Sequence, residues 1–117
     1  MSQVTIYHNP VCGKSRCALE ILKERGVDHD VIEYLQAPPD RTTLARILDL
    51  LAGPPADLVR KDKRFRELGL DAANYVNREQ VIALLVAHPE LMERPVVIRG
   101  GRAVIARPSE RVLELLD

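Results

Sequence analysis

This sequence has few aromatic residues and no excess of either charge. Its 117 residues include no Trp, one Phe and three Tyr, and 17 basic residues balance 17 acidic ones. Proteins that bind nucleic acids gain much of their affinity by neutralising phosphates, and those that bind single strands stack bases on aromatic rings. Both absences argue against nucleic acid as a partner.

Cysteine is also scarce, because the sequence has only Cys12 and Cys17. Two cysteines do not make a disulfide framework, and a chain of this length needs none. No basic and apolar leader precedes the first apolar run at residues 4–7, and no run approaches the ~20 apolar residues of a membrane span. We therefore expect a cytoplasmic protein with reduced thiols and no membrane partner, folded as a single domain over residues 1–117.

Hydrophobic patterning in the first third of the chain predicts a strand, a helix and a second strand. β-Branched residues mark strands at residues 4–7 and 29–35. Between them an apolar stripe predicts a helix over residues 14–25, which Gly26 is well suited to end. Strands joined by a helix in this way run parallel to each other.

The rest of the chain reads as a helical insert followed by a hairpin and a helix. Residues from about 40 to 88 have helical patterning, and Asp40 is a suitable N-cap for the first helix of the insert. Strands are expected at residues 95–98 and 103–106, with a final helix capped by Ser109. The predicted fold class is α/β, with the order βαβ–helical insert–ββα around a small mixed sheet.

Cys12 occupies the junction between the first strand and the first helix. The unpaired N–H groups and the dipole of a helix N-terminus attract anions, and they lower the pKa of a thiol there from ~8.5 toward ~7. Lys14 and Arg16 add positive charge nearby, and Gly13 allows close approach of the backbone. These features are typical of a nucleophilic thiolate. The alternative is a cysteine that packs in the turn as a small apolar residue.

The surroundings of Cys12 argue against two other kinds of cysteine site. Cys17 lies on the apolar stripe of the helix, so we expect it to pack in the core. The C-x-x-C motif of dithiol proteins is incomplete, because Ser15 stands at its second cysteine. A phosphatase-like C-x-x-x-x-x-R loop is excluded by Ala18 at the arginine position.

Four segments of the sequence resemble the signature segments of one enzyme family. They are "YHNPVCGKSR" at residues 7–16, "LVRK" at 58–61, "HPELMERPVV" at 88–97 and "RPSE" at 107–110. In this order they resemble the glutaredoxin-coupled arsenate reductases of the ArsC family, which have a thioredoxin-like fold. The resemblance covers nearly the whole chain.

The resemblance also implies roles for particular residues. Cys12 matches the family's nucleophile, and His8 and Ser15 match positions that support its thiolate. Pro95 matches the cis-proline that thioredoxin-like proteins place beside the active cysteine. The oxyanion-binding arginines would be Arg60, Arg94 and Arg107. Arg60 lies in the charged run "RKDKRFR", which by itself predicts only a solvated surface.

The function implied by the resemblance is reduction of arsenate to arsenite through a covalent thiol–arsenate on Cys12. Glutathione would be the co-substrate and glutaredoxin the protein partner, with no bound metal or cofactor. One alternative is a general glutathione-dependent thiol oxidoreductase with another substrate, because the same arginines would also hold the carboxylates of glutathione. A second alternative is an Spx-like regulator that binds RNA polymerase, although Ser15 and the three arginines argue against it.

Overall fold

A four-stranded mixed sheet forms the centre of the structure, a computed structural model that describes residues 3–116. Its strands are β1 (Val4–His8), β2 (His29–Glu33), β3 (Val96–Arg99) and β4 (Arg102–Ile105). Their order in the sheet is β2-β1-β3-β4, with β1 and β2 parallel and the other pairs antiparallel. The predicted βαβ unit, hairpin and mixed sheet are confirmed, although β2 ends two residues earlier than expected.

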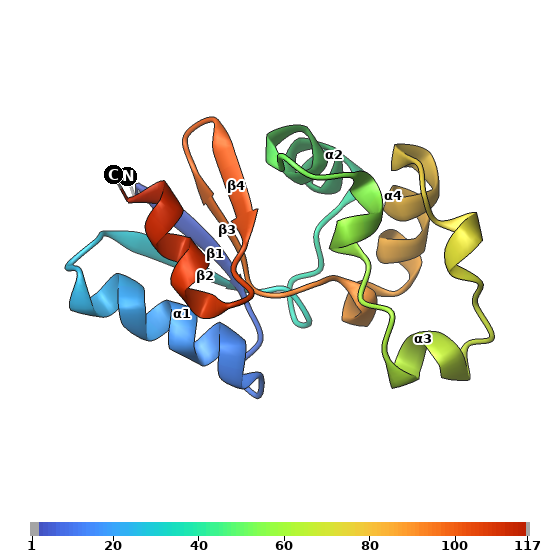
Figure 1. Ribbon diagram of the computed structural model, residues 1–117, viewed down its shortest axis with the longest axis horizontal. Helices are drawn as coiled ribbons and strands as arrows, with labels where there is room; N and C mark the ends of the chain where they lie inside the picture. The colour runs from blue at the N-terminus through green and yellow to red at the C-terminus, as the bar shows by residue number, and fades with distance from the viewer. Residues whose placement is uncertain (1–2, 117) are drawn as a thin grey trace.

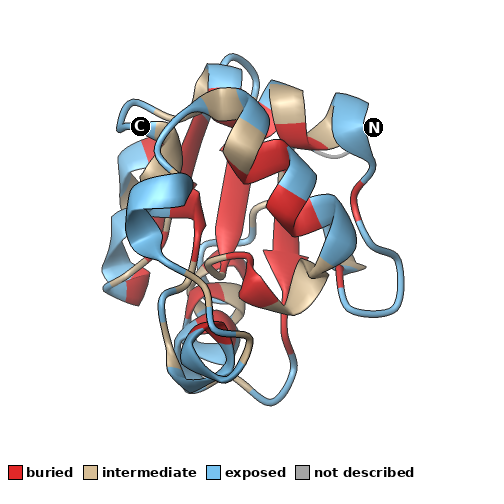
Figure 2. Cartoon of the chain, turned by 90° about the vertical axis from the view of Figure 1, so that its right-hand side faces the viewer, coloured by how far each residue is buried: buried red, intermediate tan, exposed pale blue. Residues whose placement is uncertain are grey.

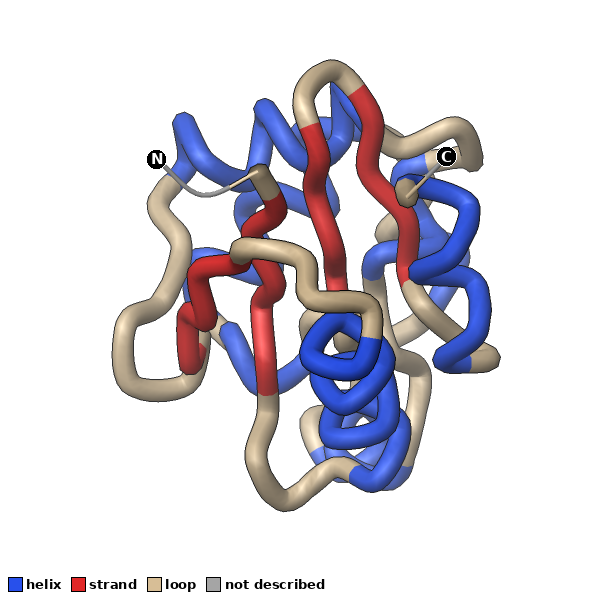
Figure 3. The backbone as a smooth tube through the Cα atoms, turned by 90° about the vertical axis from the view of Figure 1, so that its left-hand side faces the viewer, coloured by secondary structure: helices blue, strands red, loops and turns tan. Residues whose placement is uncertain are grey.

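The helices form two groups on opposite sides of the sheet (Figures 1 and 3). α1 (Gly13–Glu24) and the 3₁₀ helix η4 (Ser109–Leu115) form one group. The insert forms the other group, with α2 (Arg41–Leu50), η1 (Pro55–Leu58), α3 (Lys63–Glu67), η2 (Ala72–Asn74), α4 (Arg78–Ala87) and η3 (Pro89–Leu91). Between residues 3 and 116, none of the helices has the length and apolar character that crossing a membrane requires.

Local capping explains where the longer helices of the insert begin. The Asp40 carboxylate accepts a hydrogen bond of 2.8 Å from the Thr43 N–H at the start of α2. Asn77 and Gln80 form a capping box at the start of α4. Gly26 follows α1 with a φ of +64°, the left-handed conformation that favours glycine after a helix. The predicted Asp40 cap and the predicted stop at Gly26 are therefore confirmed.

The sheet separates two hydrophobic clusters, because successive side chains of a strand point to opposite faces. Val4 and Ile6 of β1 pack in the cluster beneath α1 and η4, whereas Tyr7 packs in the cluster beneath α2 and α4. On β3, Val97 belongs to the first cluster and Val96 to the second. Figure 2 shows these strands buried behind helices whose outward residues are exposed.

Two expectations about side chains are wrong. Cys17 is exposed rather than in the core, because the buried face of α1 runs through Ser15, Ala18 and Leu22. Ser15 is polar, so the apolar pattern does not include it in the buried face. The face predicted from that pattern is therefore rotated toward Cys17. Ser109 does not cap a final α-helix; η4 is a 3₁₀ helix, and the Ser109 hydroxyl donates to the Lys14 carbonyl at 2.8 Å.

Leu22 tests the cluster that holds α1 against the sheet, because its side chain is fully buried there. Leu22→Ala should lower the free energy of unfolding by about 2–5 kcal/mol, through lost burial and the cavity left behind. Val86→Ala on the exposed side of α4 should change it by no more than ~0.5 kcal/mol. Urea unfolding measures both. Equal losses would show that α1 does not depend on this cluster.

Candidate active site

The turn between β1 and α1 places Cys12 at the N-cap of the helix. Its N–H donates to the Asn9 carbonyl at 3.0 Å, and its carbonyl accepts from the Arg16 N–H at 3.0 Å. The backbone of Cys12 is extended, with φ −93° and ψ 121°. This geometry puts the thiol where the first N–H groups of α1 have no partner within the helix.

Cys12 has a pKa below the ordinary value for a thiol. Partial burial raises the pKa, but the Ser15 N–H, the Arg94 guanidinium and the Lys14 N–H together lower it by more. Each of these groups stabilises the thiolate and has no equivalent interaction with the neutral thiol. The structure therefore agrees with the sequence-based expectation of a lowered thiol pKa, and it identifies Arg94 as the side chain that contributes.

Ser15 and His8 form a buried pair beneath the turn. The Ser15 hydroxyl lies 2.7 Å from Nδ1 of His8, and it accepts a hydrogen bond of 3.0 Å from the Asn9 N–H. Burial lowers the pKa of His8, which favours the neutral imidazole. The Asn9 amide oxygen in turn accepts from the Val11 N–H at 3.1 Å. The two predicted supporting residues thus hold the turn that carries Cys12.

Arg94 reaches the site from the segment that leads into β3. The Arg94–Pro95 peptide bond is cis, as predicted for Pro95. Nε of Arg94 is buried and has no hydrogen-bond partner among residues 3–116. A buried donor without a partner costs free energy unless something binds it, so this side chain is prepared for an acceptor near Cys12.

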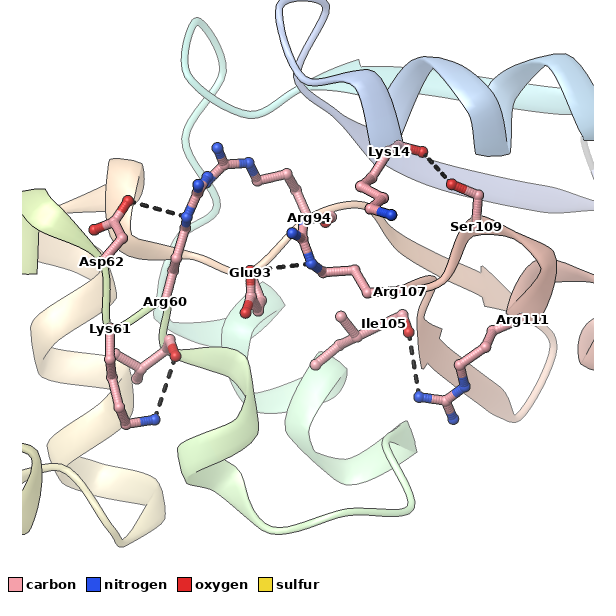
Figure 4. Close-up of polar contacts among 11 residues, drawn as sticks. Lys14, Arg60, Lys61, Asp62, Glu93, Arg94, Ile105, Arg107, Ser109 and Arg111 are labelled. Atoms are coloured by element: carbon pink, nitrogen blue, oxygen red, sulfur yellow. Dashed lines mark hydrogen bonds and ion pairs between the residues drawn. The ribbon is translucent and has the colours of Figure 1, made fainter.

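Arg60 lies beside Arg94 because two distant segments pair. Val59 and Met92 form an isolated antiparallel bridge. The Arg60 N–H donates to the Leu91 carbonyl at 2.7 Å. The Arg60 and Arg94 side chains extend toward the same point (Figure 4). Arg60 is therefore part of the site, although the charged run in which it lies predicts only a solvated surface.

Arg107 completes the group from the end of β4. Its Nη1 donates to the Arg94 carbonyl at 3.0 Å, and its Nε lies 3.9 Å from a carboxylate oxygen of Glu93 (Figure 4). The Arg107–Pro108 bond is also cis, which the sequence analysis did not anticipate. The structure thus brings all three predicted arginines together, with Arg94 next to the thiol.

Two carboxylates within this group were missed. Nε of Arg60 pairs with Asp62 at 2.9 Å, and Glu93 lies beside Arg107. The two carboxylates come together only because residues 58–60 pair with residues 91–93. A contact between segments so far apart in the sequence produces no periodic pattern, so the sequence does not predict it.

Cys12 opens onto a shallow groove at the surface. Its lining consists of Cys12, Gly13, Lys14, Cys17, Ser109 and Glu110. Both thiols are free and lie along this groove, so a thiol reagent has access to each of them. Within residues 3–116, no cluster of three or more His, Cys, Asp or Glu side chains is placed to hold a metal ion.

Together the fold and the site define a thioredoxin-like α/β protein in which a cysteine with a lowered pKa lies beside a group of three arginines. The ArsC family model matches residues 7–115, and the chain belongs to the ArsC family. It is 46% identical to the uncharacterized protein YfgD of Escherichia coli K12, over 97% of both chains. It is 41% identical to an arsenate reductase of Neisseria meningitidis serogroup B, over 99% of this chain and 100% of that one. The solved structure of an arsenate reductase from Vibrio cholerae superposes with a TM-score of 0.86 at 36% identity, covering 97% of this chain and 98% of the other.

The contribution of Arg94 to the thiolate is testable by alkylation in a Cys17→Ser background, where Cys12 is the remaining thiol. The rate of reaction with iodoacetamide against pH should show an inflection below the ~8.5 of a free cysteine. Arg94→Ala should move the inflection to higher pH, because the thiolate loses its nearest guanidinium. Arg66→Ala, which removes an exposed arginine of α3, should leave it unchanged. An inflection at the same pH with and without the Arg94 side chain would contradict the contribution of Arg94 to the thiolate.

Proposed function

We propose that this protein reduces arsenate to arsenite, with Cys12 as the nucleophile. The observation that carries the proposal is the position of the Cys12 thiol at a helix N-terminus against Arg94, with Arg60 and Arg107 nearby. An ionised sulfur beside several guanidinium groups suits attack on an oxyanion. The arsenate reductases among the relatives support arsenate as that oxyanion.

Binding of arsenate would use the groups that lack partners in the structure. The buried Nε of Arg94 offers a donor, and the planar fork of an arginine matches two oxygens of a tetrahedral anion. The first N–H groups of α1 add further donors beside Cys12. These donors are fixed before the anion arrives, so the charge that develops on the oxygens is stabilised without rearrangement.

In the first chemical step the Cys12 thiolate attacks arsenic. A sulfur–arsenic bond forms and one arsenic–oxygen bond breaks, and the departing oxygen takes up protons and leaves as water. The oxidation state of arsenic does not change in this step. The product is a covalent thiol–arsenate on Cys12, whose remaining oxygens stay within the arginine group.

Two further thiols then supply the two electrons. The thiol of glutathione displaces a second oxygen as water and forms a bond to arsenic. A glutaredoxin thiolate attacks the glutathione sulfur, which gives a mixed disulfide and leaves the electron pair on arsenic, now As(III). Water replaces Cys12 on arsenic, and arsenite and the free thiol are released. Both thiols are kept reduced in the cytoplasm, where we place the reaction.

The open groove beside Cys12 supports this sequence, because both co-reactants must reach the adduct. Lys14 lines the groove and would attract a carboxylate of glutathione. Glutaredoxin must approach closely enough for its sulfur to contact the bound glutathione. A groove that is open at the surface permits that approach, whereas an enclosed cavity would prevent it.

The role of Cys12 is tested by NADPH-coupled arsenate reduction with glutathione, glutaredoxin and glutathione reductase. Cys12→Ser should abolish turnover, because a hydroxyl is not ionised at neutral pH and does not form the adduct. Cys17→Ser is the matched control and should retain most of the activity. Full activity of Cys12→Ser would refute the mechanism. A wild-type protein that reduces glutathione mixed disulfides but not arsenate would instead favour a general thiol oxidoreductase.

Arg60 is tested by the KM for arsenate in the same assay. Arg60→Ala should raise KM about 10- to 100-fold, which corresponds to the ~1.5–3 kcal/mol of a hydrogen bond to a charged group. Arg66→Ala removes the same charge from an exposed position six residues away and should change KM less than twofold. Equal effects would mean that Arg60 acts only through the general charge of the surface.

A further inference from the structure

A partly buried carboxylate lies within the group of arginines that we propose to bind the oxyanion. The Glu93 side chain is 23% exposed, and its Oε1 is buried with no hydrogen-bond partner among residues 3–116. The nearest cation to this oxygen is Nε of Arg107, at 3.9 Å, which is beyond hydrogen-bond distance. A buried carboxylate oxygen in this condition is poorly stabilised in its charged form.

Asp62, the other carboxylate of the group, has close partners that Glu93 lacks. It accepts a hydrogen bond from the Phe65 N–H at 3.3 Å as the N-cap of α3, and it pairs with Nε of Arg60 at 2.9 Å. Each of its two carboxylate oxygens therefore has a partner. Of the two carboxylates, Glu93 is the one with a buried oxygen that has no partner among residues 3–116.

The charge on Glu93 matters for the binding of an oxyanion, because the positive and negative charges of the site nearly balance. Arg60, Arg94 and Arg107 carry three positive charges, and Asp62 and Glu93 carry two negative ones when both are ionised. These five side chains leave one net positive charge to meet an oxyanion that carries up to two negative charges, and a Cys12 thiolate would offset that charge as well. Glu93 and the bound anion would then repel each other in a partly buried site, where solvent screens them weakly.

Charged and polar groups from three segments of the chain surround Glu93. Burial raises the pKa of Glu93, and the nearby charge of Asp62 raises it further. Arg107, the Arg94 N–H and Lys61 oppose the rise without cancelling it. A bound oxyanion would add a second negative charge on the same side as Asp62 and raise the pKa again.

We propose that Glu93 is the charge-compensating residue of the oxyanion site, and that it takes up one proton from solvent when an oxyanion binds and releases it when the anion leaves. This inference rests on the proposed function, because it takes the three arginines as the binding site. It makes oxyanion affinity depend on pH. Above the pKa of free Glu93, binding requires proton uptake, so affinity falls as pH rises.

Sulfate is the appropriate probe, because it keeps the tetrahedral shape and its two charges throughout the neutral range, whereas arsenate titrates there. Cys12→Ser protein is used so that the thiol neither titrates nor reacts. Calorimetric titrations in two buffers of different ionisation enthalpy count the protons taken up. At pH values above the pKa of free Glu93 the expected uptake approaches one proton per sulfate, and Kd should rise by up to tenfold per pH unit there.

Glu93→Gln, added to Cys12→Ser, should abolish the proton uptake and make Kd nearly independent of pH. At about pH 8 it should also bind sulfate more tightly, by the factor through which Kd has risen at that pH in Cys12→Ser protein, because the repelling charge is gone. Glu90→Gln is the matched control: it removes a carboxylate three residues away that pairs with Arg64 and His88, and it should keep the uptake. The proton count on Cys12→Ser needs no substitution at Glu93, so an absence of uptake overturns the inference even if Glu93→Gln fails to fold.

Sulfate binding without proton uptake, or an uptake that survives Glu93→Gln, would overturn the inference. Arsenate reduction by the wild-type protein, measured in parallel, separates this failure from that of the proposed function. Activity with no proton uptake overturns the role of Glu93 alone. A wild-type protein that does not reduce arsenate, together with Cys12→Ser protein that binds no sulfate, overturns both.

Discussion

The stabilisation of one sulfur anion is the interaction on which the rest of this structure depends. The Cys12 thiol meets the first N–H groups of α1 and the guanidinium of Arg94, which come from opposite ends of the chain. Burial of the thiol opposes ionisation, so these donors must be held in place for the thiolate to prevail. Much of the architecture serves to hold them. Ser15 and His8 fix the turn from below, and Ser109 ties η4 to the start of α1 through the Lys14 carbonyl.

The helical insert has a clear role in this arrangement. α2 and α4 pack on the face of the sheet away from α1, and the segment between them returns to pair with residues just before β3. The pairing of Val59 with Met92 aligns Arg60 with Arg94. Without the insert, the sheet and its flanking segments would still bring Arg94 and Arg107 to Cys12. The insert adds Arg60, the third arginine of the group.

Patterning in the sequence predicted the fold well, because helices and strands are determined locally by periodicity and caps. The stop at Gly26 and the capping of α2 by Asp40 followed the expected chemistry. The site was only partly predictable. Cys12 carried its own local signal, whereas Arg60 was identified from the family resemblance alone. Glu93 and Asp62 join the arginines through a contact between distant segments, and Cys17 was misplaced because buried Ser15 is part of the inward face of α1.

The combination of charges suits the function that we propose. Arg94 stabilises the thiolate, and all three arginines would meet the incoming oxyanion, while Asp62 and Glu93 offset part of their positive charge. The most direct test is a crystal structure of the protein soaked with arsenate. The account predicts arsenic bonded to Sγ of Cys12, with its oxygens within hydrogen-bond distance of Arg60, Arg94 and Arg107. Arsenate bound away from Cys12, or an adduct whose oxygens contact none of these arginines, would contradict it.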